Sequence, residues 1–95
     1  LLLSQVIWIQ ADDYCVKVHA ESKSYTIRMS LKKLVKQLSP YGFIRIHRSA
    51  IININYLDHV DYHETYIKLK NDSIIPFSKS GIKALKQRMT SVISH

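Results

Sequence analysis

Cysteine, glycine and proline are scarce in this sequence of 95 residues, which has two Gly, two Pro and a single Cys, Cys15. One cysteine excludes an intramolecular disulfide and a thiolate cluster for zinc or for iron and sulfur. It suits a reducing cytoplasm, where we expect the protein to act. Cys15 falls in an alternating pattern typical of a strand, so we interpret it as a packing or surface residue rather than a redox sensor. The longest apolar run is about four residues, whereas a spanning helix needs roughly twenty, so a transmembrane segment is excluded.

Acidic residues are also few, because seven Asp and Glu stand against fourteen Lys and Arg, giving a net charge of +7 and a pI near 9.7. This charge favours polyanionic partners, namely duplex DNA, RNA or an anionic membrane surface. Hydrophobic residues make up 46% of the chain, which is enough for the core of one small domain. The chain starts without Met or a basic leader, so we expect no signal peptide. We expect residues 1–5 to end a linker from a missing N-terminal region and residues 6–95 to form one domain.

The first third of the chain has the periodicity of strands. Residues 6–9 form a continuous apolar run, typical of a strand covered on both faces. After a turn at Asp12-Asp13, apolar and polar residues alternate over residues 14–21 and again over residues 25–30, with a polar turn between them. This alternation predicts an antiparallel hairpin with one exposed face.

The period changes to that of a helix over residues 31–38, where Ser30 can cap the first turn and Pro40 with Gly42 ends the helix. Strand alternation returns over residues 44–54, with Asn53 among the polar positions. Arg48 interrupts the apolar parity of this segment. The interruption indicates a bulge or loop at Arg48-Ser49 that turns a charged side chain out of the sheet.

The last third predicts a second hairpin, an edge strand and a closing helix. The hairpin joins residues 57–62 to residues 66–70, and Pro76 places the strand at residues 74–77 on a sheet edge. Ser78 or Ser80 is expected to cap the closing helix. The residues expected on its buried face are Ile82, Leu85, Met89 and Val92 or Ile93. The patterns together predict a mainly β fold with one short internal helix and a C-terminal helix.

Residues 43–53 carry a specific resemblance to a known family. They read FIRIHRSAIIN, which resembles the signature of LytTR DNA-binding domains: a hydrophobic-Arg-hydrophobic-His-Arg-Ser core followed by a hydrophobic pair and Asn. Residues 6–14 resemble the opening strand and loop of the family, residues 30–34 its short helix, and residues 75–79 its late strand and loop. The resemblance covers residues 6–86 in the order of the family.

The resemblance implies antiparallel strands in stacked small sheets, lying along duplex DNA and sending loops into successive major grooves. By motif, Arg48 and Lys79 occupy loop positions that face DNA, and the loop after residue 11 offers Asp13 and Tyr14 to another groove. The chain departs from the family at Ala50, where an aromatic is frequent, and at Lys79, where Arg is frequent. The family also implies direct-repeat half-sites and a covalently linked N-terminal input domain, commonly a phosphorylatable receiver. We expect the isolated domain to be monomeric and to pair on DNA.

The chemistry of these residues supports the same reading. An Arg fork matches O6 and N7 of guanine, and Lys reaches these acceptors or a phosphate. Serine hydroxyls and an exposed helix N-terminus donate to phosphate oxygens. The base-contact candidates are Arg48, Lys79, Asp13 and Tyr14. The phosphate-contact candidates are Arg45, His47, Ser49, Ser78, Ser80, Lys83 and Lys86. We expect no catalytic residue, metal site or cofactor.

Structural alternatives exist for several of these residues. Arg48 can form a surface ion pair with Asp13, and such pairs are common and weak. Lys79 can be merely solvated, and His47 can bond its own loop and hold Arg48 in place. The lysines of residues 31–38 suit a solvated helix face better than a DNA surface.

Two other functions compete with DNA binding. A metal-dependent nuclease would use the Asp and His residues of positions 58–63, but their alternation is expected of any solvated strand face, and Gly-rich phosphate loops and nucleophile motifs are missing. An RNA-binding module would stack bases on exposed aromatics, whereas most Tyr and Phe here fall on apolar parity, with Tyr66 an exception. We therefore expect a sequence-specific DNA-binding output domain of a bacterial transcription regulator that belongs to a two-component system, rather than an enzyme.

Overall fold

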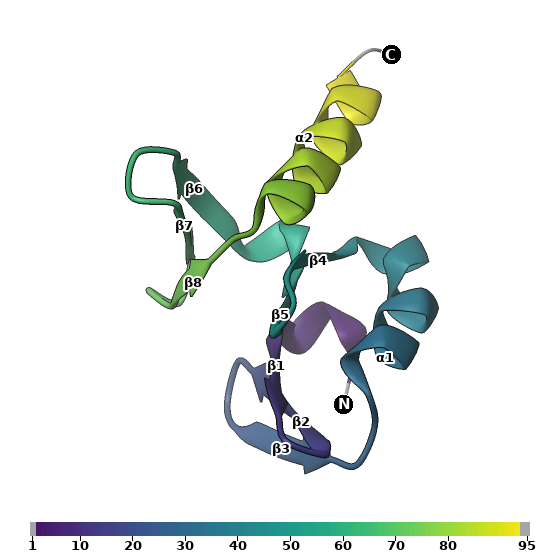
Figure 1. Ribbon diagram of the computed structural model, residues 1–95. Coiled ribbons are helices and arrows are strands. Elements are labelled where there is room, and N and C mark those ends of the chain that lie inside the picture. Colours follow the sequence, from purple (N-terminus) through teal and green to yellow (C-terminus); the bar gives the residue numbers. More distant parts are fainter. Residues whose placement is uncertain (1, 94–95) are drawn as a thin grey trace.

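A computed structural model describes residues 2–93, which form two antiparallel sheets and two α-helices (Figure 1). The helices are α1 (Leu31–Leu38) and α2 (Lys79–Ile93). The strands are β1 (Val6–Asp12), β2 (Cys15–Ala20), β3 (Ser24–Ile27), β4 (Phe43–His47), β5 (Ala50–Asn53), β6 (Leu57–Asp61), β7 (Tyr66–Leu69) and β8 (Ile74–Pro76). Short 3-10 turns are η1 (Leu3–Gln5), η2 (Ser39–Tyr41) and η3 (Ile54–Tyr56).

The strands form a five-stranded sheet in the order β3-β2-β1-β5-β4 and a three-stranded sheet in the order β6-β7-β8. Every strand pair is antiparallel. The predicted mainly β fold, with stacked antiparallel sheets, one short internal helix and a C-terminal helix, is confirmed. Neither helix in the described part of the chain has the length and apolar character needed to cross a membrane.

Each face of the five-stranded sheet has its own hydrophobic core. The core under α1 contains the buried residues Val6, Ile9, Val16, Val18, Leu31, Phe43 and Ile51. The other core lies against α2 and the three-stranded sheet and contains Ile7, Ile44, Ile46, Ala50, Ile52, Ile67, Leu69, Ile75, Ile82 and Leu85. Because β1 and β5 supply residues to both cores, both faces of these strands are covered, as the apolar run at residues 6–9 predicts.

The two-sided burial of β5 corrects one sequence expectation. Asn53 is only 2% exposed, although the alternation placed it with the polar positions. Its side-chain Nδ2 donates to the carbonyl oxygen of Val6 at 2.9 Å, and its Oδ1 accepts from the backbone N–H of Asn55 at 3.0 Å. β5 lies between β1 and β4 with a core on each side, so a polar side chain there is buried and must find its hydrogen bonds within the protein.

The helix boundaries follow local capping chemistry. Ser30 Oγ accepts from the backbone N–H of Lys33 at 3.2 Å, which confirms the predicted cap of α1. Ser78 caps α2, since its Oγ accepts from the backbone N–H of Gly81 at 3.0 Å. Met89 is 41% exposed, so its predicted burial is wrong: the far end of α2 projects beyond the sheets (Figure 1). The side chains of Val92 and Ile93 lie outside the described part of the chain.

Candidate nucleic-acid interface

The turn between β4 and β5 presents Arg48 to solvent, as the broken parity predicts. β4 ends at His47 and β5 begins at Ala50, so Arg48 and Ser49 form the turn. The guanidinium of Arg45 donates through Nη2 to the carbonyl oxygen of Arg48 at 2.7 Å. This bond holds the backbone of the turn and leaves the exposed Arg48 side chain unpaired within the described residues. Arg48 does not form the alternative ion pair with Asp13, since the ion pairs among residues 2–93 involve other side chains.

His47 is fixed by the same turn. The backbone N–H of Ser49 donates to His47 Nδ1 at 3.2 Å, and Ser49 Oγ lies 2.8 Å from the same nitrogen. Because Nδ1 accepts the backbone N–H of Ser49 in this arrangement, the ring N–H lies on Nε2. His47 therefore bonds its own loop and still has an N–H to donate to a ligand oxygen, so the structural role and a phosphate contact are compatible.

The start of α2 is held against β4, close to this turn. The backbone N–H of Ser78 donates to the carbonyl oxygen of Ile46 at 2.8 Å, and Ser78 Oγ lies 3.3 Å from Ser80 Oγ. Gly81 makes the approach possible, because a Cβ at this position would lie 2.0 Å from the Ile46 carbonyl oxygen. Residues more than thirty positions apart in sequence therefore meet at one place.

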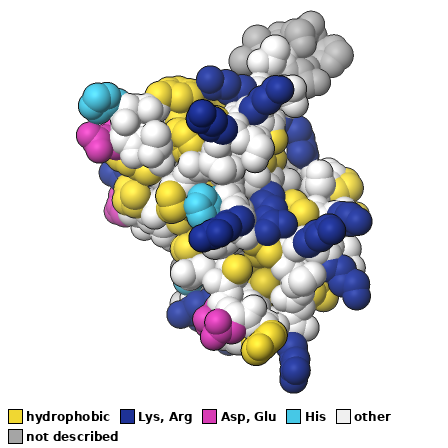
Figure 2. All heavy atoms as spheres, in the orientation of Figure 1, with side chains coloured by type: hydrophobic (Ala, Val, Ile, Leu, Met, Phe, Trp, Pro, Cys, Tyr) yellow, Lys and Arg dark blue, Asp and Glu magenta, His cyan; other side chains and the backbone are white. Residues whose placement is uncertain are grey.

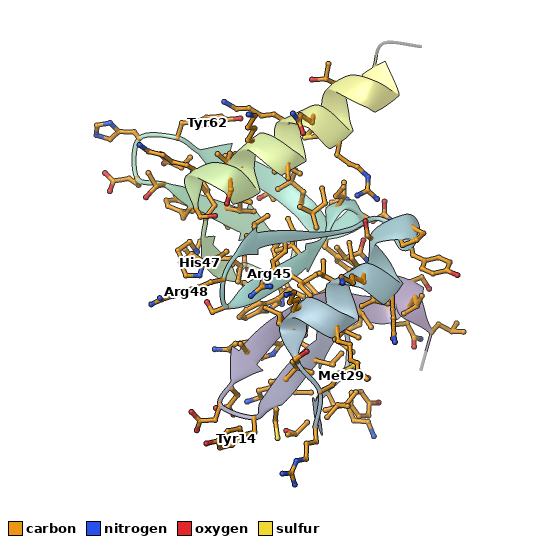
Figure 3. The ribbon with its side chains drawn as sticks, turned by 45° about the vertical axis from the view of Figure 1, so that its right-hand side comes forward. Tyr14, Met29, Arg45, His47, Arg48 and Tyr62 are labelled. Carbon is orange, nitrogen blue, oxygen red and sulfur yellow. The ribbon has the colours of Figure 1, made fainter. Side chains whose placement is uncertain are left out.

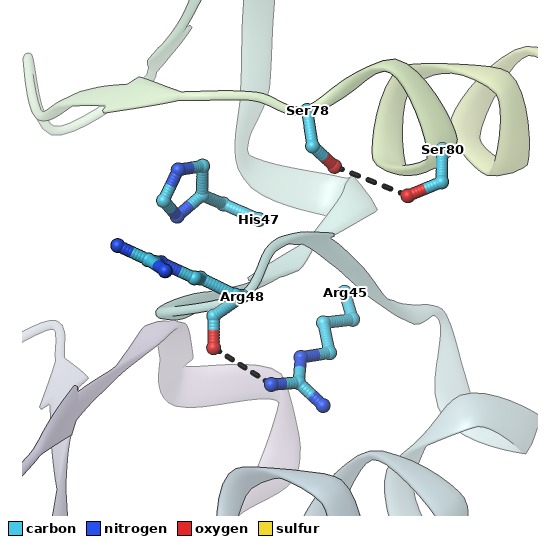
Figure 4. A pocket seen from close by; sticks show the side chains of 5 residues that line it. All are labelled: Arg45, His47, Arg48, Ser78 and Ser80. Atoms are coloured by element: carbon cyan, nitrogen blue, oxygen red, sulfur yellow. Dashed lines mark hydrogen bonds between the residues drawn. The ribbon is translucent and has the colours of Figure 1, made fainter.

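The two segments enclose a hollow of about 430 Å³, lined by Arg45, His47, Arg48, Ser78 and Ser80 (Figure 4). The side chains of His47 and Arg48 extend in the same direction, and Ser78 and Ser80 lie opposite them at the start of α2, with their hydroxyls turned toward each other. All five are candidates from the sequence, and the set combines two guanidinium groups with imidazole and hydroxyl donors. Such a set suits an oxyanion such as phosphate.

A second hollow of about 510 Å³ lies on the other side of the same turn. Arg45 and Arg48 line both hollows, so they stand between them. The candidates Asp13 and Tyr14 line the second hollow, and Tyr14 is 85% exposed. Tyr14, Arg48 and His47 lie along one side of the molecule (Figure 3). The structure thus brings together the β1–β2 turn, the β4–β5 turn and the start of α2.

Sequence reasoning missed two cations of the second hollow, Arg28 and Lys32. The sequence patterns place Lys32 on a solvated helix face and Arg28 among the polar positions of the strand expected over residues 25–30. The register of β2 with β3 determines where Arg28 lies. Ile27 pairs with Val16, so Arg28, the next residue, lies beside the β1–β2 turn. The alternation pattern alone does not fix that register, since several offsets preserve the same faces.

The remaining lysine candidates lie on α2 and are exposed. Lys79, Lys83 and Lys86 are spaced four and three residues apart, so they follow one side of the helix. The ammonium of Lys86 lies 4.7 Å from the ring centroid of Tyr62, a cation–π contact that ties it to the turn after β6. Lys79 and Lys83 have no charged partner among the described residues.

Positive charge dominates the face that carries the β4–β5 turn. Lys and Arg side chains spread over the centre, top and right of Figure 2, and acidic side chains lie toward its left and lower edges. Four of the seven acidic residues belong to the hairpin of β6 and β7 or its following turn: Asp58, Asp61, Glu64 and Asp72. The field over this face therefore attracts polyanions.

The acidic side chains of the β6–β7 hairpin, where a metal site was considered, interact with neighbouring residues of the same hairpin. Asp61 Oδ1 accepts from the backbone N–H of Glu64 at 2.8 Å, and this hydrogen bond lowers the pKa of the Asp61 carboxyl. His59 lies 3.6 Å from its neighbour Asp58, and His63 lies 3.9 Å from Glu64. Within residues 2–93, no three His, Cys, Asp or Glu side chains gather closely enough to hold a metal ion.

Comparison with known proteins identifies one matching family and several related regulatory proteins. The family model of the LytTr DNA-binding domain matches residues 1–90. The sensory transduction protein LytT of Bacillus subtilis is 33% identical over 85 residues, which cover 86% of this chain and 35% of that protein. The transcriptional regulatory protein YpdB of Escherichia coli is 29% identical over 91 residues, which cover 92% of this chain and 37% of that protein. The chain thus spans little more than a third of these relatives.

The fold also matches a solved structure. A LytTr DNA-binding domain from Bacillus cereus superposes with a TM-score of 0.81 at 30% sequence identity, covering 92% of this chain and 83% of that one.

Proposed function

The chain belongs to the LytTR DNA-binding domain family, and from this premise we propose that it binds duplex DNA sequence-specifically in transcription regulation. In this proposal the β4–β5 turn enters a major groove. The observation that carries the proposal is the convergence of Arg45, His47 and Arg48 with Ser78 and Ser80 around one hollow. This convergence joins two segments distant in sequence on the face of Figure 2 where many Lys and Arg side chains lie.

Arg48 is the side chain best placed to read a base. Its backbone is held by Arg45, whereas its guanidinium is exposed and unpaired among the described residues. A major groove about 12 Å wide admits such a turn, and the Arg fork matches O6 and N7 of guanine. The preorganised turn lowers the entropy lost on binding, because the backbone is already fixed. Lys79, beside Ser78 at the start of α2, is the second base-contact candidate.

The phosphate contacts come from groups around this turn. The His47 Nε2 proton and the hydroxyls of Ser49, Ser78 and Ser80 supply neutral donors, and Arg45 and Lys83 supply charge. Lys86 belongs to the same set, although its contact with Tyr62 competes with phosphate binding. Asp13 and Tyr14, in the turn after β1, line the second hollow with Arg48 and are proposed as further base contacts.

The wider context is also proposed. The curated relatives are almost three times as long as the matched segment. We therefore infer that this domain is the output part of a response regulator, joined through residues 1–5 to an N-terminal input domain of the phosphorylatable receiver type. The family suggests that two copies, each monomeric when free, occupy direct-repeat half-sites on one side of the duplex.

The exposed aromatics do not support the RNA-binding alternative. Three tyrosines are more than half exposed, Tyr14 at 85%, Tyr41 at 63% and Tyr62 at 56%. They belong to the β1–β2 turn, to η2 and to the segment after β6, so they do not form one stacking platform on a sheet. Tyr66, the exception in the sequence pattern, is partly covered and packs edge-on against His59 with ring centroids 6.2 Å apart.

A salt titration tests the proposed function. The chain is titrated with duplex DNA selected from a random pool and with single-stranded RNA of equal length, at several salt concentrations. We expect preference for the duplex and a log–log salt dependence steeper than about −3, since each phosphate contact contributes about −0.9. A flat salt response, or stronger binding of the RNA, overturns the proposal. Magnesium-dependent cleavage of the DNA that Asp61→Ala abolishes would establish a nuclease instead.

A further inference from the structure

We propose that the hollow between the β1–β2 turn and α1 is a second phosphate-binding surface, in which Arg28 and Lys32 hold the DNA strand opposite the one held by the Arg45–Ser78 hollow. The inference rests on the proposed function and adds a partner for two cations that the sequence pattern assigned to solvent. Its ligand is the sugar-phosphate backbone rather than a base.

The geometry of a turn in a groove leads to this assignment. Two sugar-phosphate strands border a major groove about 12 Å wide, so a turn that enters it is flanked by a strand on each side. Arg45 and Arg48 line both hollows, and the hollows therefore flank the turn in the same way. If one hollow receives the strand on one side, the other hollow faces the strand across the groove.

The second hollow has the chemistry of a phosphate contact. Its cations are Arg28, Lys32 and the shared Arg45 and Arg48, and its single acid is Asp13. Arg28 and Lys32 are exposed and have no partner among the described residues, so their charges are free to act on a ligand. Ala11, Met29 and Leu31 supply the apolar part of the lining, which suits a deoxyribose.

Both cations are held in position by the fold. Pairing of Ile27 with Val16 fixes the end of β3 beside the start of β2, and Arg28 follows at once. Leu31 is buried in the core under α1, which fixes the rotation of the helix and the direction of Lys32. Successive helix residues point about 100° apart, so Lys33 leaves the helix on another side and is not among the residues that line the hollow.

The neighbouring lysines give a charge-matched comparison. Lys32→Gln and Lys33→Gln change the net charge equally, so a difference between them reports position. For Lys32→Gln, and likewise for Arg28→Gln, we expect the salt slope to decrease by about 0.9. The ratio of wild-type to variant affinity then grows about eightfold for each tenfold decrease in salt. Operator and random-sequence duplex are affected equally, and Lys33→Gln stays near wild type.

Cys15 offers an independent readout, because it is the only cysteine and it lines the second hollow. Alkylation by iodoacetamide is followed with and without the selected duplex. We expect DNA to slow the reaction of Cys15. The control protein carries Cys15→Ser with Ser22→Cys, which moves the thiol to the exposed turn at the opposite end of β2. Its reaction rate is expected to be unchanged by DNA.

The outcomes separate this inference from the proposed function. Slower alkylation of Cys15, together with a smaller salt slope for Lys32→Gln but not for Lys33→Gln, supports a phosphate strand in the hollow. Normal salt-dependent DNA binding with an unprotected Cys15, or with Lys32→Gln and Lys33→Gln indistinguishable, overturns the inference and leaves the proposed function standing. Absence of duplex binding by the unmodified chain overturns both.

Discussion

Gly81→Ala is expected to separate α2 from β4, because no space exists for the added methyl group. The new Cβ would lie 2.0 Å from the Ile46 carbonyl oxygen and 2.4 Å from its carbonyl carbon. Both are backbone atoms in a strand, so they cannot rotate away as a side chain can. The start of α2 must move by about 1 Å or more to restore contact distances, and this movement strains the packing.

The cost follows from what that movement disrupts. Overpacking costs about 1–3 kcal/mol. Loss of the Ser78 N–H bond to Ile46, now 2.8 Å long, adds about 1 kcal/mol. Alanine recovers up to about 1 kcal/mol through its better helix propensity. We expect the free energy of unfolding to decrease by about 2 kcal/mol, and DNA binding to weaken as well, because Ser78 and Ser80 move away from the Arg48 turn.

Urea denaturation measures the effect, with Gln87→Ala as the control at an exposed position of the same helix. The control should change the stability by less than about 0.5 kcal/mol. If Gly81→Ala is as stable as wild type, or more stable, then α2 is not held against β4 as described, and the hollow between them loses its basis.

Three further changes test other parts of the account. Asn53→Ala removes both hydrogen bonds of a buried amide and should lower the free energy of unfolding by about 2–3 kcal/mol in urea denaturation. Ser78→Ala removes the cap of α2 and should cost about 1 kcal/mol in the same assay. Burial, and secondarily Lys17, lowers the pKa of His19 below its ordinary value. The unfolded chain therefore binds the proton more readily, so stability should fall as the pH drops below about 6.5. His19→Gln should reduce this fall, measured as the urea midpoint against pH. An unchanged pH dependence in this variant would show that His19 does not cause the fall.

Much of the fold is predictable from sequence because local signals and tertiary packing agree. The apolar run at residues 6–9 correctly indicates a strand covered on both faces, and Ser30 and Pro76 mark a helix start and an edge strand. Arg48 interrupts an apolar pattern where the chain turns between β4 and β5. In each case a short local pattern agrees with the packing that distant parts of the chain supply.

The features that escape prediction depend on contacts between distant segments. Asn53 looks like an exposed position, because alternation does not show that a second core covers its side of β5. Gly81 looks like a weak helix residue until β4 is placed against it. Arg28 belongs to the second hollow only through the register of β2 with β3. The candidate site was accordingly predictable as a set of residues, but its division into two hollows was not.

The central claim, that Arg48 reads a base from a preformed turn, is tested most directly by Arg48→Ala. Affinity is measured for the selected operator and for random-sequence duplex, with stability determined on the same samples. Arg45 bonds the Arg48 carbonyl and not its side chain, so the variant should stay folded within about 0.5 kcal/mol of wild type. We predict a loss of about 1–3 kcal/mol on the operator and much less on random duplex, whereas Lys83→Ala should weaken both equally. A folded Arg48→Ala protein that still distinguishes operator from random duplex as well as wild type does would contradict the claim.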